Sequence, residues 1–162
     1  MNGIPALAVS AAPALAQAIV KDLDPRTLLV DPDSESRPWV ESIARPLGLD
    51  VLVGEKVRKG DREVTLSITD ITAVRGPPAM LVDDMISSGT TLIACTHLLR
   101  EAGVTKVEAV ATHSLASRAD LERLADQGTA RLRATDSTSS PIASIPLAEV
   151  LCKAIRDQGC LE

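Results

Sequence analysis

Residues 81–92 read LVDDMISSGTTL, an apolar pair followed by two adjacent acids and then a run of small residues. The apolar pair suits the end of a buried strand, whereas Asp83 and Asp84 repel each other and are poor strand formers. We therefore expect a strand over about residues 79–82, with both acids at its end. The apolar period of the residues that follow predicts a helix that ends at Gly103.

On both sides of this stretch, short β-branched runs alternate with segments of apolar period 3.6. A parallel sheet with crossover helices requires this order, so the predicted fold class is α/β, with a central and mostly parallel sheet flanked by helices. Residues 131–134 and 142–145 are each expected to form an edge strand, and residues 64–68 a strand antiparallel to its predecessor. The other strands are expected at 27–30, 51–53 and 107–111.

Proline, serine and glycine mark the helices that are expected between these strands. A helix that includes Pro38 is expected to end at Gly48, and Ser117 is expected to open a short helix with a capping box. The last helix begins at Pro146 and is expected to turn its apolar residues toward the core; these are Leu147, Val150, Leu151, Ala154 and Ile155. With 45% hydrophobic residues, the chain suits one domain over residues 1–162.

The composition argues against several classes of function. A net charge of −5 and a single aromatic residue, Trp39, argue against a nucleic-acid partner. No apolar run approaches the roughly 18–20 residues that a membrane span needs, so no membrane partner is expected. Three cysteines without CxxC spacing, and an Ala-rich start without the basic residues of a signal peptide, predict reduced thiols and a cytoplasmic location.

The small residues after the acid pair predict an anion site; they are Ser87, Ser88, Gly89, Thr90 and Thr91. A loop between a strand and a helix presents unpaired backbone N–H groups, to which the hydroxyl groups add donors. Each charge-assisted hydrogen bond contributes about 1.5–3 kcal/mol, so four or five of them hold a phosphate monoester on an acidic protein. A simple helix cap uses one or two such residues, and neither a P-loop nor a Rossmann fingerprint fits.

The two acids predict a second part of this site, next to the anion site. Carboxylates only accept hydrogen bonds, so Asp83 and Asp84 suit the hydroxyl groups of a sugar rather than a phosphate. Two carboxylates beside a phosphate cradle fit a molecule with a phosphate at one end and a vicinal diol a few ångströms away. A ribose 5-phosphate moiety has this layout.

The same stretch resembles the ribose-5-phosphate loop of the phosphoribosyltransferase superfamily, and specifically that of ribose-phosphate pyrophosphokinases. LLVDPDSESRPWVESIA (28–44) is similar to the strand, loop and helix around an Asp of the family's pyrophosphate loop. VLVGEKVRKGD (51–61) resembles its catalytic Lys-x-Arg region, and VEAVATHSLAS (107–117) its next strand and turn. The resemblance covers nearly the whole chain and implies a type I phosphoribosyltransferase-like fold.

The resemblance implies a role for each candidate residue. The acid pair would bind the ribose hydroxyls, and residues 87–91 would hold the 5-phosphate. Asp33 would help to bind the Mg²⁺ that bridges ATP to the sugar, and Lys56 and Arg58, on a mobile loop, would stabilise charge on the transferred group. Without the resemblance, these two basic residues are better interpreted as a solvated turn. The implied reaction is attack of the ribose 1-hydroxyl on the β-phosphorus of Mg-ATP, which releases AMP.

Two features depart from the family's pattern. Residues 34–36 (Ser-Glu-Ser) follow Asp33 where the family usually has a pair of glycines, as in a divergent subgroup. The chain also resembles only the second of the two similar halves of a family subunit. The first half normally supplies most ATP contacts, including a His that partners the metal-binding Asp, and we expect that half to be absent here.

Two other functions stay open at this point. One is a stand-alone phosphoribosyltransferase acting on a base, although the chain shows no recognisable hood and only one aromatic residue. The other is a non-catalytic regulatory subunit of the same fold. The expected small-molecule partners are ribose 5-phosphate and ATP. Family members associate into dimers and larger rings, so a homo-oligomer is expected.

Overall fold

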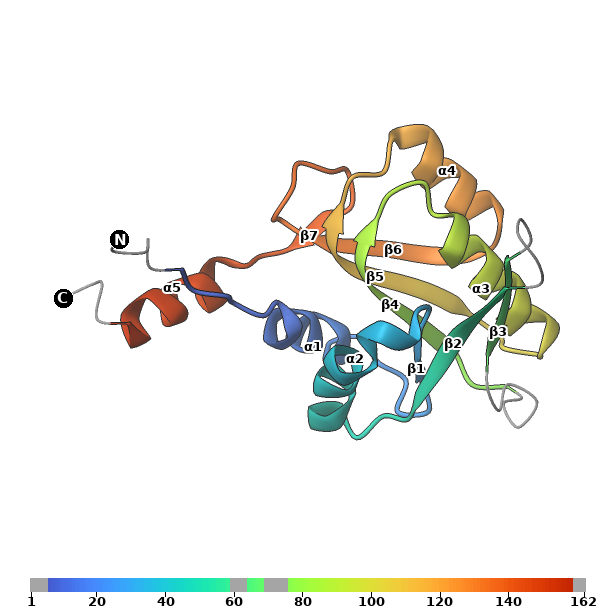
Figure 1. The fold of residues 1–162 in the computed structure, drawn as a ribbon, viewed down its shortest axis with the longest axis horizontal. Helices are drawn as coiled ribbons and strands as arrows, with labels where there is room; N and C mark the ends of the chain where they lie inside the picture. Colours follow the sequence, from blue (N-terminus) through green and yellow to red (C-terminus); the bar gives the residue numbers. More distant parts are fainter. Residues whose placement is uncertain (1–5, 59–63, 69–75, 159–162) are drawn as a thin grey trace.

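The computed structural model describes residues 6–58, 64–68 and 76–158, whose strands form one seven-stranded sheet (Figure 1). The strand order is β3-β2-β1-β4-β5-β6-β7. All neighbouring pairs are parallel except β2 and β3, which are antiparallel at one edge, as predicted. The strands are β1 (Leu28–Asp31), β2 (Val51–Arg58), β3 (Val64–Ile68), β4 (Ala79–Ile86), β5 (Val107–Ser114), β6 (Thr129–Thr135) and β7 (Ala143–Ile145). The predicted α/β class with a mostly parallel sheet is confirmed.

Helices cover both faces of this sheet. α1 and α2 lie on one face and α3 and α4 on the other (Figure 1). The helices are α1 (Ala12–Val20), α2 (Arg37–Ala44), α3 (Thr90–Glu101), α4 (Arg118–Asp126) and α5 (Ala148–Asp157), with the short 3₁₀ turns η1 (Ser34–Ser36) and η2 (Arg45–Leu47). In the described part of the chain, no helix is both long and apolar enough to cross a membrane.

Local sequence signals fix several helix ends. Ser117 and Asp120 form the predicted capping box of α4: the Ser117 side chain accepts from the Asp120 N–H, and the Asp120 carboxylate accepts from the Ser117 N–H at 3.1 Å. The chain leaves η2 at Gly48 with φ 64°, a left-handed conformation that glycine adopts without strain. These elements are confirmed where the sequence predicted them.

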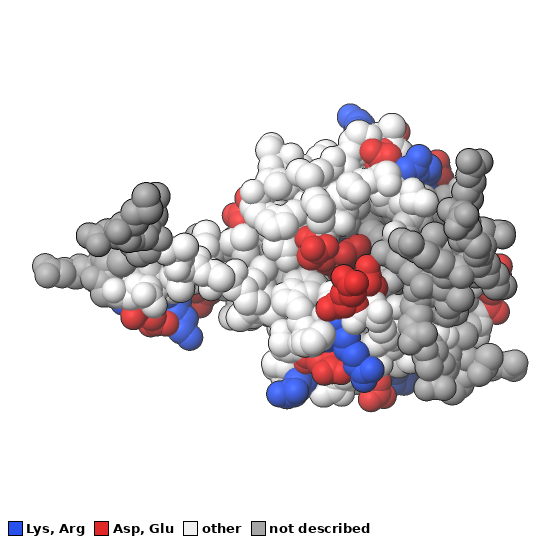
Figure 2. Space-filling view, viewed as in Figure 1, with Lys and Arg blue, Asp and Glu red and all other residues white. Residues whose placement is uncertain are grey.

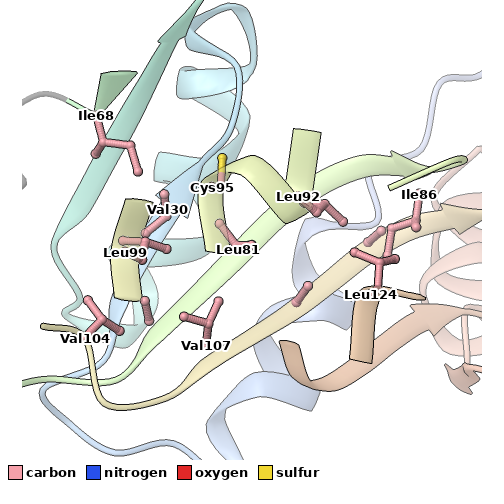
Figure 3. Close-up of a cluster of buried hydrophobic side chains, with 13 residues drawn as sticks. Val30, Ile68, Leu81, Ile86, Leu92, Cys95, Leu99, Val104, Val107 and Leu124 are labelled. Carbon is pink, nitrogen blue, oxygen red and sulfur yellow. The ribbon is translucent and has the colours of Figure 1, made fainter. Parts of the chain in front are cut away.

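Two apolar layers hold the sheet between the helices. Figure 3 shows one layer, in which Val30 and Leu81 of the sheet meet Leu92 and Leu99 of α3 and Leu124 of α4. On the opposite face, Leu29, Met80 and Val82 pack in the cluster formed with α1 and α2. Successive strand residues enter opposite layers, as the pleat of a strand requires. The carboxyl edge of the sheet is therefore supported from both sides.

The central strand is longer than the sequence predicted. β4 continues past residue 82 to Ile86, so Asp83 and Asp84 lie within the strand rather than at its end. The extension pairs with β5, from Asp83 opposite Ala111 to Ile86 opposite Ser114. Backbone pairing with a neighbour therefore outweighs the poor strand propensity of the two acids.

Two further expectations are wrong. Both depend on how one element packs against others, which local sequence patterns do not determine. β6 lies between β5 and β7 and is not an edge strand. α5 forms near its predicted position but buries none of its residues, and Leu151 and Ile155 are 45% and 41% exposed. Leu147 and Val150 pack against the α1–α2 cluster. The rest of α5 reaches away from the sheet (Figure 1).

Candidate functional site

The candidate residues gather at the carboxyl edge of the central strands. β1 and β4 are parallel neighbours, with Val30 opposite Leu81, so the segments that follow them emerge at the same edge. One segment is the turn with Asp33 and the other is the loop at residues 87–89. In open α/β sheets this edge is where ligands bind.

The loop after β4 forms a small polar pocket. Gly89 is the N-cap of α3 and makes no side-chain cap hydrogen bond, so the N–H groups of the first helical turn, which includes Thr90 and Thr91, have no intrahelical acceptor. The pocket has a volume of about 60 Å³ and is lined by Asp83, Met85, Ile86, Leu92 and every residue from Ser87 to Thr91. This volume is well below the roughly 300–1,000 Å³ of typical small-molecule pockets, so the pocket suits a single small group such as a phosphate.

α4 supports this loop from the side. A Cβ atom on Gly89 would lie 2.7 Å from Cδ1 of Leu124, and the φ of Gly89 is 73°, so both space and backbone conformation require glycine. Arg123 donates hydrogen bonds to the carbonyl oxygen of Ser88 and, at 2.9 Å, to Oδ1 of Asp120. Arg123 thus brings a positive charge to the loop. Sequence reasoning missed Arg123 and Leu124, although the Ser117 capping box fixed the helix that carries them.

The two acids are adjacent but line different hollows. Asp83 lines the 60 Å³ pocket, whereas Asp84 lines a larger hollow of about 540 Å³ on the other face of β4. Because successive residues of a strand point to opposite faces, the strand extension directs the two side chains into different hollows, although Asp84 stays close enough to raise the pKa of Asp83. The larger hollow is also lined by Ser36, Trp39, Thr112 and His113 and by residues 8–11.

The environment of Asp83 favours its neutral form. Burial, followed by the neighbouring Asp84, raises the pKa of Asp83 to about 6. Its Oδ1 accepts a hydrogen bond from the backbone N–H of Asp84 at 2.8 Å. Among the described residues, no Lys or Arg forms an ion pair with either carboxylate. The pair is therefore available to hydrogen-bond donors of a ligand.

A second carboxylate shapes the turn that carries Asp33. Asp31 is fully buried at the end of β1, and its Oδ1 accepts from the N–H of Asp33 at 3.0 Å and from Oγ of Ser36 at 2.8 Å. Burial raises the pKa of Asp31, and within the described part of the chain its Oδ2 has no hydrogen-bond partner. Asp33 caps η1 by accepting from the N–H of Glu35 at 3.3 Å. Asp31 was not singled out from the sequence, although it directly follows the strand predicted at residues 27–30.

The donor set at this edge is compatible with Mg²⁺. The described residues contain no group of three or more His, Cys, Asp or Glu that would enclose a metal ion. Mg²⁺ keeps several waters and binds through one or two carboxylates together with substrate phosphates, so an enclosing cluster is not required. Asp33 offers carboxylate oxygen on an edge shared with the acid pair.

Lys56 and Arg58 lie in β2 rather than on the expected loop. Their backbones pair with Leu66 and Val64 of β3, so the antiparallel ribbon continues through Arg58. The charged sequence did not predict this extension of β2, because the extension depends on backbone pairing with β3. Residues 59–63, which complete the predicted charged stretch, lie outside the described residues.

The charge distribution explains why an anion needs local donors. Figure 2 shows acidic side chains gathered near the middle of the displayed face. On this face a phosphate group would depend on the N–H and hydroxyl groups of the loop and on the nearby Arg123, because the described residues at its middle are acidic.

The fold and this edge define the class of the protein. A parallel sheet with an acid pair on its central strand, followed by a small-residue loop at a helix N-terminus, matches the phosphoribosyl transferase domain, whose family model covers residues 4–135. The chain belongs to this family. Its curated relatives include ribose-phosphate pyrophosphokinases from Methanobrevibacter smithii, 28% identical over 164 residues, and from Pyrococcus furiosus, 32% identical over 120 residues.

These relatives are longer than this chain. The alignments cover 95% and 74% of this chain but 55% and 42% of the two relatives, so the chain spans about half of their length. Phosphoribosylpyrophosphate synthetase from Mycobacterium smegmatis has a TM-score of 0.72 and 27% identity, over 92% of this chain and 50% of that one. Adenine phosphoribosyltransferase from Giardia lamblia, with a TM-score of 0.58 and 21% identity over 75% and 77% of the two chains, shares the fold.

Proposed function

We propose that this chain is the ribose-5-phosphate-binding part of a ribose-phosphate pyrophosphokinase, which makes phosphoribosyl pyrophosphate from ribose 5-phosphate and ATP. One observation carries the proposal: Asp83 lines the same small pocket as the loop from Ser87 to Thr91. The loop supplies N–H and hydroxyl donors for a phosphate, and Asp83 supplies acceptors for a hydroxyl group next to it. The similarity to ribose-phosphate pyrophosphokinases supports the same assignment.

In this proposal the loop and the acids position the sugar for transfer. Ser87, Ser88, Gly89, Thr90 and Thr91 bind the 5-phosphate, while Asp83 and Asp84 accept hydrogen bonds from the ribose hydroxyls. The 1-hydroxyl oxygen attacks the β-phosphorus of ATP, its proton passes to solvent, and the bond from the β-phosphorus to the bridging oxygen of AMP breaks. Such a transfer depends on alignment and on charge neutralisation.

Charge neutralisation falls to three residues in this proposal. Asp33 holds Mg²⁺, which neutralises charge on the phosphates when it is bound. Lys56 and Arg58 stabilise the charge that develops on the transferred pyrophosphoryl group. Both residues lie on the antiparallel β2–β3 ribbon at the edge of the sheet.

Ribose 5-phosphate binding by the Asp83→Asn, Asp84→Asn double variant tests the proposal. Calorimetry on the full chain is expected to show binding by the wild type and a loss of at least about tenfold in the variant, because each lost charge-assisted hydrogen bond contributes about 1.5–3 kcal/mol. Asp50→Asn, at an exposed carboxyl before β2, is the matched control. Wild-type affinity in the double variant would contradict the proposal.

Product analysis separates the proposed activity from its alternatives. Formation of AMP and phosphoribosyl pyrophosphate from ATP and ribose 5-phosphate supports the pyrophosphokinase. Base-dependent release of pyrophosphate from phosphoribosyl pyrophosphate would instead identify a stand-alone phosphoribosyltransferase. Sugar-phosphate binding without either reaction is expected of a non-catalytic subunit, or of a half that needs a second half for turnover.

A further inference from the structure

We propose that Asp31 is a positioning residue, whose buried carboxylate fixes the turn that presents Asp33 to Mg²⁺. This inference rests on the proposed function, in which Asp33 holds the metal. In this assignment Asp31 contacts neither metal nor substrate and acts only through the conformation of the turn. The two acids are separated in sequence by Pro32 alone, so their roles differ because of their surroundings.

The surroundings of Asp31 keep it away from any ligand. It is the last residue of β1, which lies between β2 and β4, and it is fully buried. Asp33, in contrast, is only partly buried. Because Mg²⁺ usually keeps several of its waters, a carboxylate that binds it has to reach solvent. Asp33 meets this requirement and Asp31 does not.

One oxygen of the Asp31 carboxylate closes the turn. Oδ1 accepts a hydrogen bond from the backbone N–H of Asp33 at 3.0 Å, which is the bond of an Asx turn around Pro32. The proline suits the middle of this turn because its ring already fixes φ. The same Oδ1 lies 2.8 Å from Oγ of Ser36. A single oxygen atom therefore ties together both ends of the segment from Asp33 to Ser36.

Ser36 holds the other backbone group of Asp33. Its N–H donates to the carbonyl oxygen of Asp33 at 3.0 Å, and its Oγ lies 2.9 Å from the same oxygen. The N–H of Asp33 is thus held by Asp31 and its carbonyl group by Ser36. With both groups held, the direction in which the Asp33 side chain leaves the turn is fixed.

β2 supports the turn from a second direction. A Cβ atom on Gly54 would lie 3.0 Å from the carbonyl oxygen of Pro32 and 3.1 Å from that of Asp31, closer than an ordinary van der Waals contact. Glycine therefore allows this strand to pass directly beside the turn. Lys56 follows two residues later in the same strand. The turn that carries Asp33 is thus packed against the strand that carries Lys56.

The second oxygen of the Asp31 carboxylate lowers the stability of the fold. Oδ2 is buried and has no hydrogen-bond partner within the part of the chain that the structure describes. A buried polar atom without a partner costs free energy, and proteins retain such costs mainly at functional sites. This unpaired oxygen supports a role for Asp31 in the site rather than in stability alone.

Metal binding by variants of Asp31 tests the proposal. The full chain, with ribose 5-phosphate present, is titrated with Mn²⁺ as a paramagnetic substitute for Mg²⁺, and bound Mn²⁺ is measured by electron paramagnetic resonance. Asp31→Ala should weaken Mn²⁺ binding by about tenfold, because losing the partner that orients a metal ligand typically costs 10–100-fold in affinity. Asp31→Asn keeps an acceptor oxygen and should stay within about twofold of the wild type. Asp33→Ala should weaken binding at least as much as Asp31→Ala, and Asp50→Ala, at an exposed acid, should match the wild type.

Amide hydrogen exchange of Asp33, followed by NMR, reports the turn without any metal. The Asp33 N–H should be protected in the wild type and in Asp31→Asn. It should exchange at least about tenfold faster in Asp31→Ala, where its acceptor is missing. Unchanged ribose 5-phosphate affinity in Asp31→Ala would show that the fold and the loop after β4 are intact.

Three results would overturn the inference. In the first, Asp31→Ala retains wild-type Mn²⁺ affinity, so the turn needs no positioning. In the second, Asp31→Asn loses as much affinity as Asp31→Ala, so the charge of Asp31 matters and Asp31 is itself a metal ligand. In the third, the Asp33 amide exchanges equally fast in the wild type and in Asp31→Ala.

These failures are distinct from failure of the proposed function. The proposed function fails if the wild type does not bind ribose 5-phosphate. A chain that binds ribose 5-phosphate, but whose Mn²⁺ affinity is the same in Asp33→Ala as in the wild type, keeps the sugar-phosphate site. It loses the assignment of the metal to Asp33, and the inference about Asp31 with it.

Discussion

The position of the Asp83 carboxyl lowers the stability of the folded chain at neutral pH. Its pKa rises from 3.8 to about 6, first because of burial and then because of Asp84. Between about pH 4 and pH 6 the folded state therefore binds more protons than the unfolded state, so stability falls as the pH rises through this window and stays lower above it. Functional sites often retain such costs because the ligand needs the charge.

Asp83→Asn should therefore stabilise the chain at neutral pH. We expect the free energy of unfolding at pH 7.5 to rise by about 1–2 kcal/mol, less than the full shift implies because the pair is partly exposed to solvent. At pH 4 and below, where the wild-type carboxyl is largely protonated in the folded state, the difference should shrink toward zero. Urea unfolding at both pH values, with Asp50→Asn as control, measures this. An equal difference at the two pH values would contradict the assignment of the cost to this carboxyl.

At the scale of elements, the loop and α4 act as one unit. Gly89→Ala places a methyl group 2.7 Å from Leu124 and strains a backbone with φ 73°. Gly103→Ala is a matched control, because φ is 93° there but nothing lies within 4 Å of the added Cβ. We expect a loss of about 1 kcal/mol for the control and about 2–4 kcal/mol for Gly89→Ala. Identical urea midpoints for the two variants would show that Leu124 does not confine the loop.

Arg123 links α4 to the same loop through the carbonyl oxygen of Ser88. Arg123→Ala should weaken ribose 5-phosphate binding by about fivefold, because a partly exposed charge-assisted contact contributes about 1 kcal/mol. Arg118→Ala removes an arginine of the same helix that is paired with Glu122 and 87% exposed, away from the loop. Calorimetry should show no change for this control. Equal affinities for the two variants would remove Arg123 from the site.

Local signals predicted the elements, and tertiary pairing decided their limits. The glycine at position 48 and the capping box at Ser117 act within a few residues, so the sequence was sufficient for them. The end of β4 depends on its pairing with β5, and the interior position of β6 depends on β7, neither of which is encoded locally. Tertiary pairing also decided part of the site. The loop was predicted from the sequence, but the placement of Asp83 and Asp84 on two faces of β4 follows only from the longer strand.

At the scale of the whole molecule, α5 leaves an apolar stripe uncovered. Leu151 and Ile155 are exposed on a helix that reaches away from the sheet. Exposed apolar side chains that lie together favour association. We therefore predict that the chain self-associates through α5, consistent with the expected homo-oligomer.

Light scattering of the full chain tests this association. The wild type should exceed the 17.0 kDa of one chain at high concentration. The Leu151→Glu, Ile155→Glu double variant should shift toward that mass with unchanged circular dichroism, because charges on the stripe oppose its burial. Lys153→Glu, on the polar side of the same helix, is the control. A wild type that scatters as a single chain at high concentration would refute the prediction.

The central claim is that the 60 Å³ pocket and the acids of β4 hold two ends of one phosphorylated pentose. Calorimetric titration of the wild-type chain with ribose 5-phosphate, inorganic phosphate and ribose tests it most directly. Because linking two contacts in one ligand removes the entropic cost of a second association, the account predicts that ribose 5-phosphate binds at least about 100-fold more tightly than either fragment. Equal binding of ribose 5-phosphate and inorganic phosphate would contradict it, because the acids would then contribute nothing to recognition of the sugar.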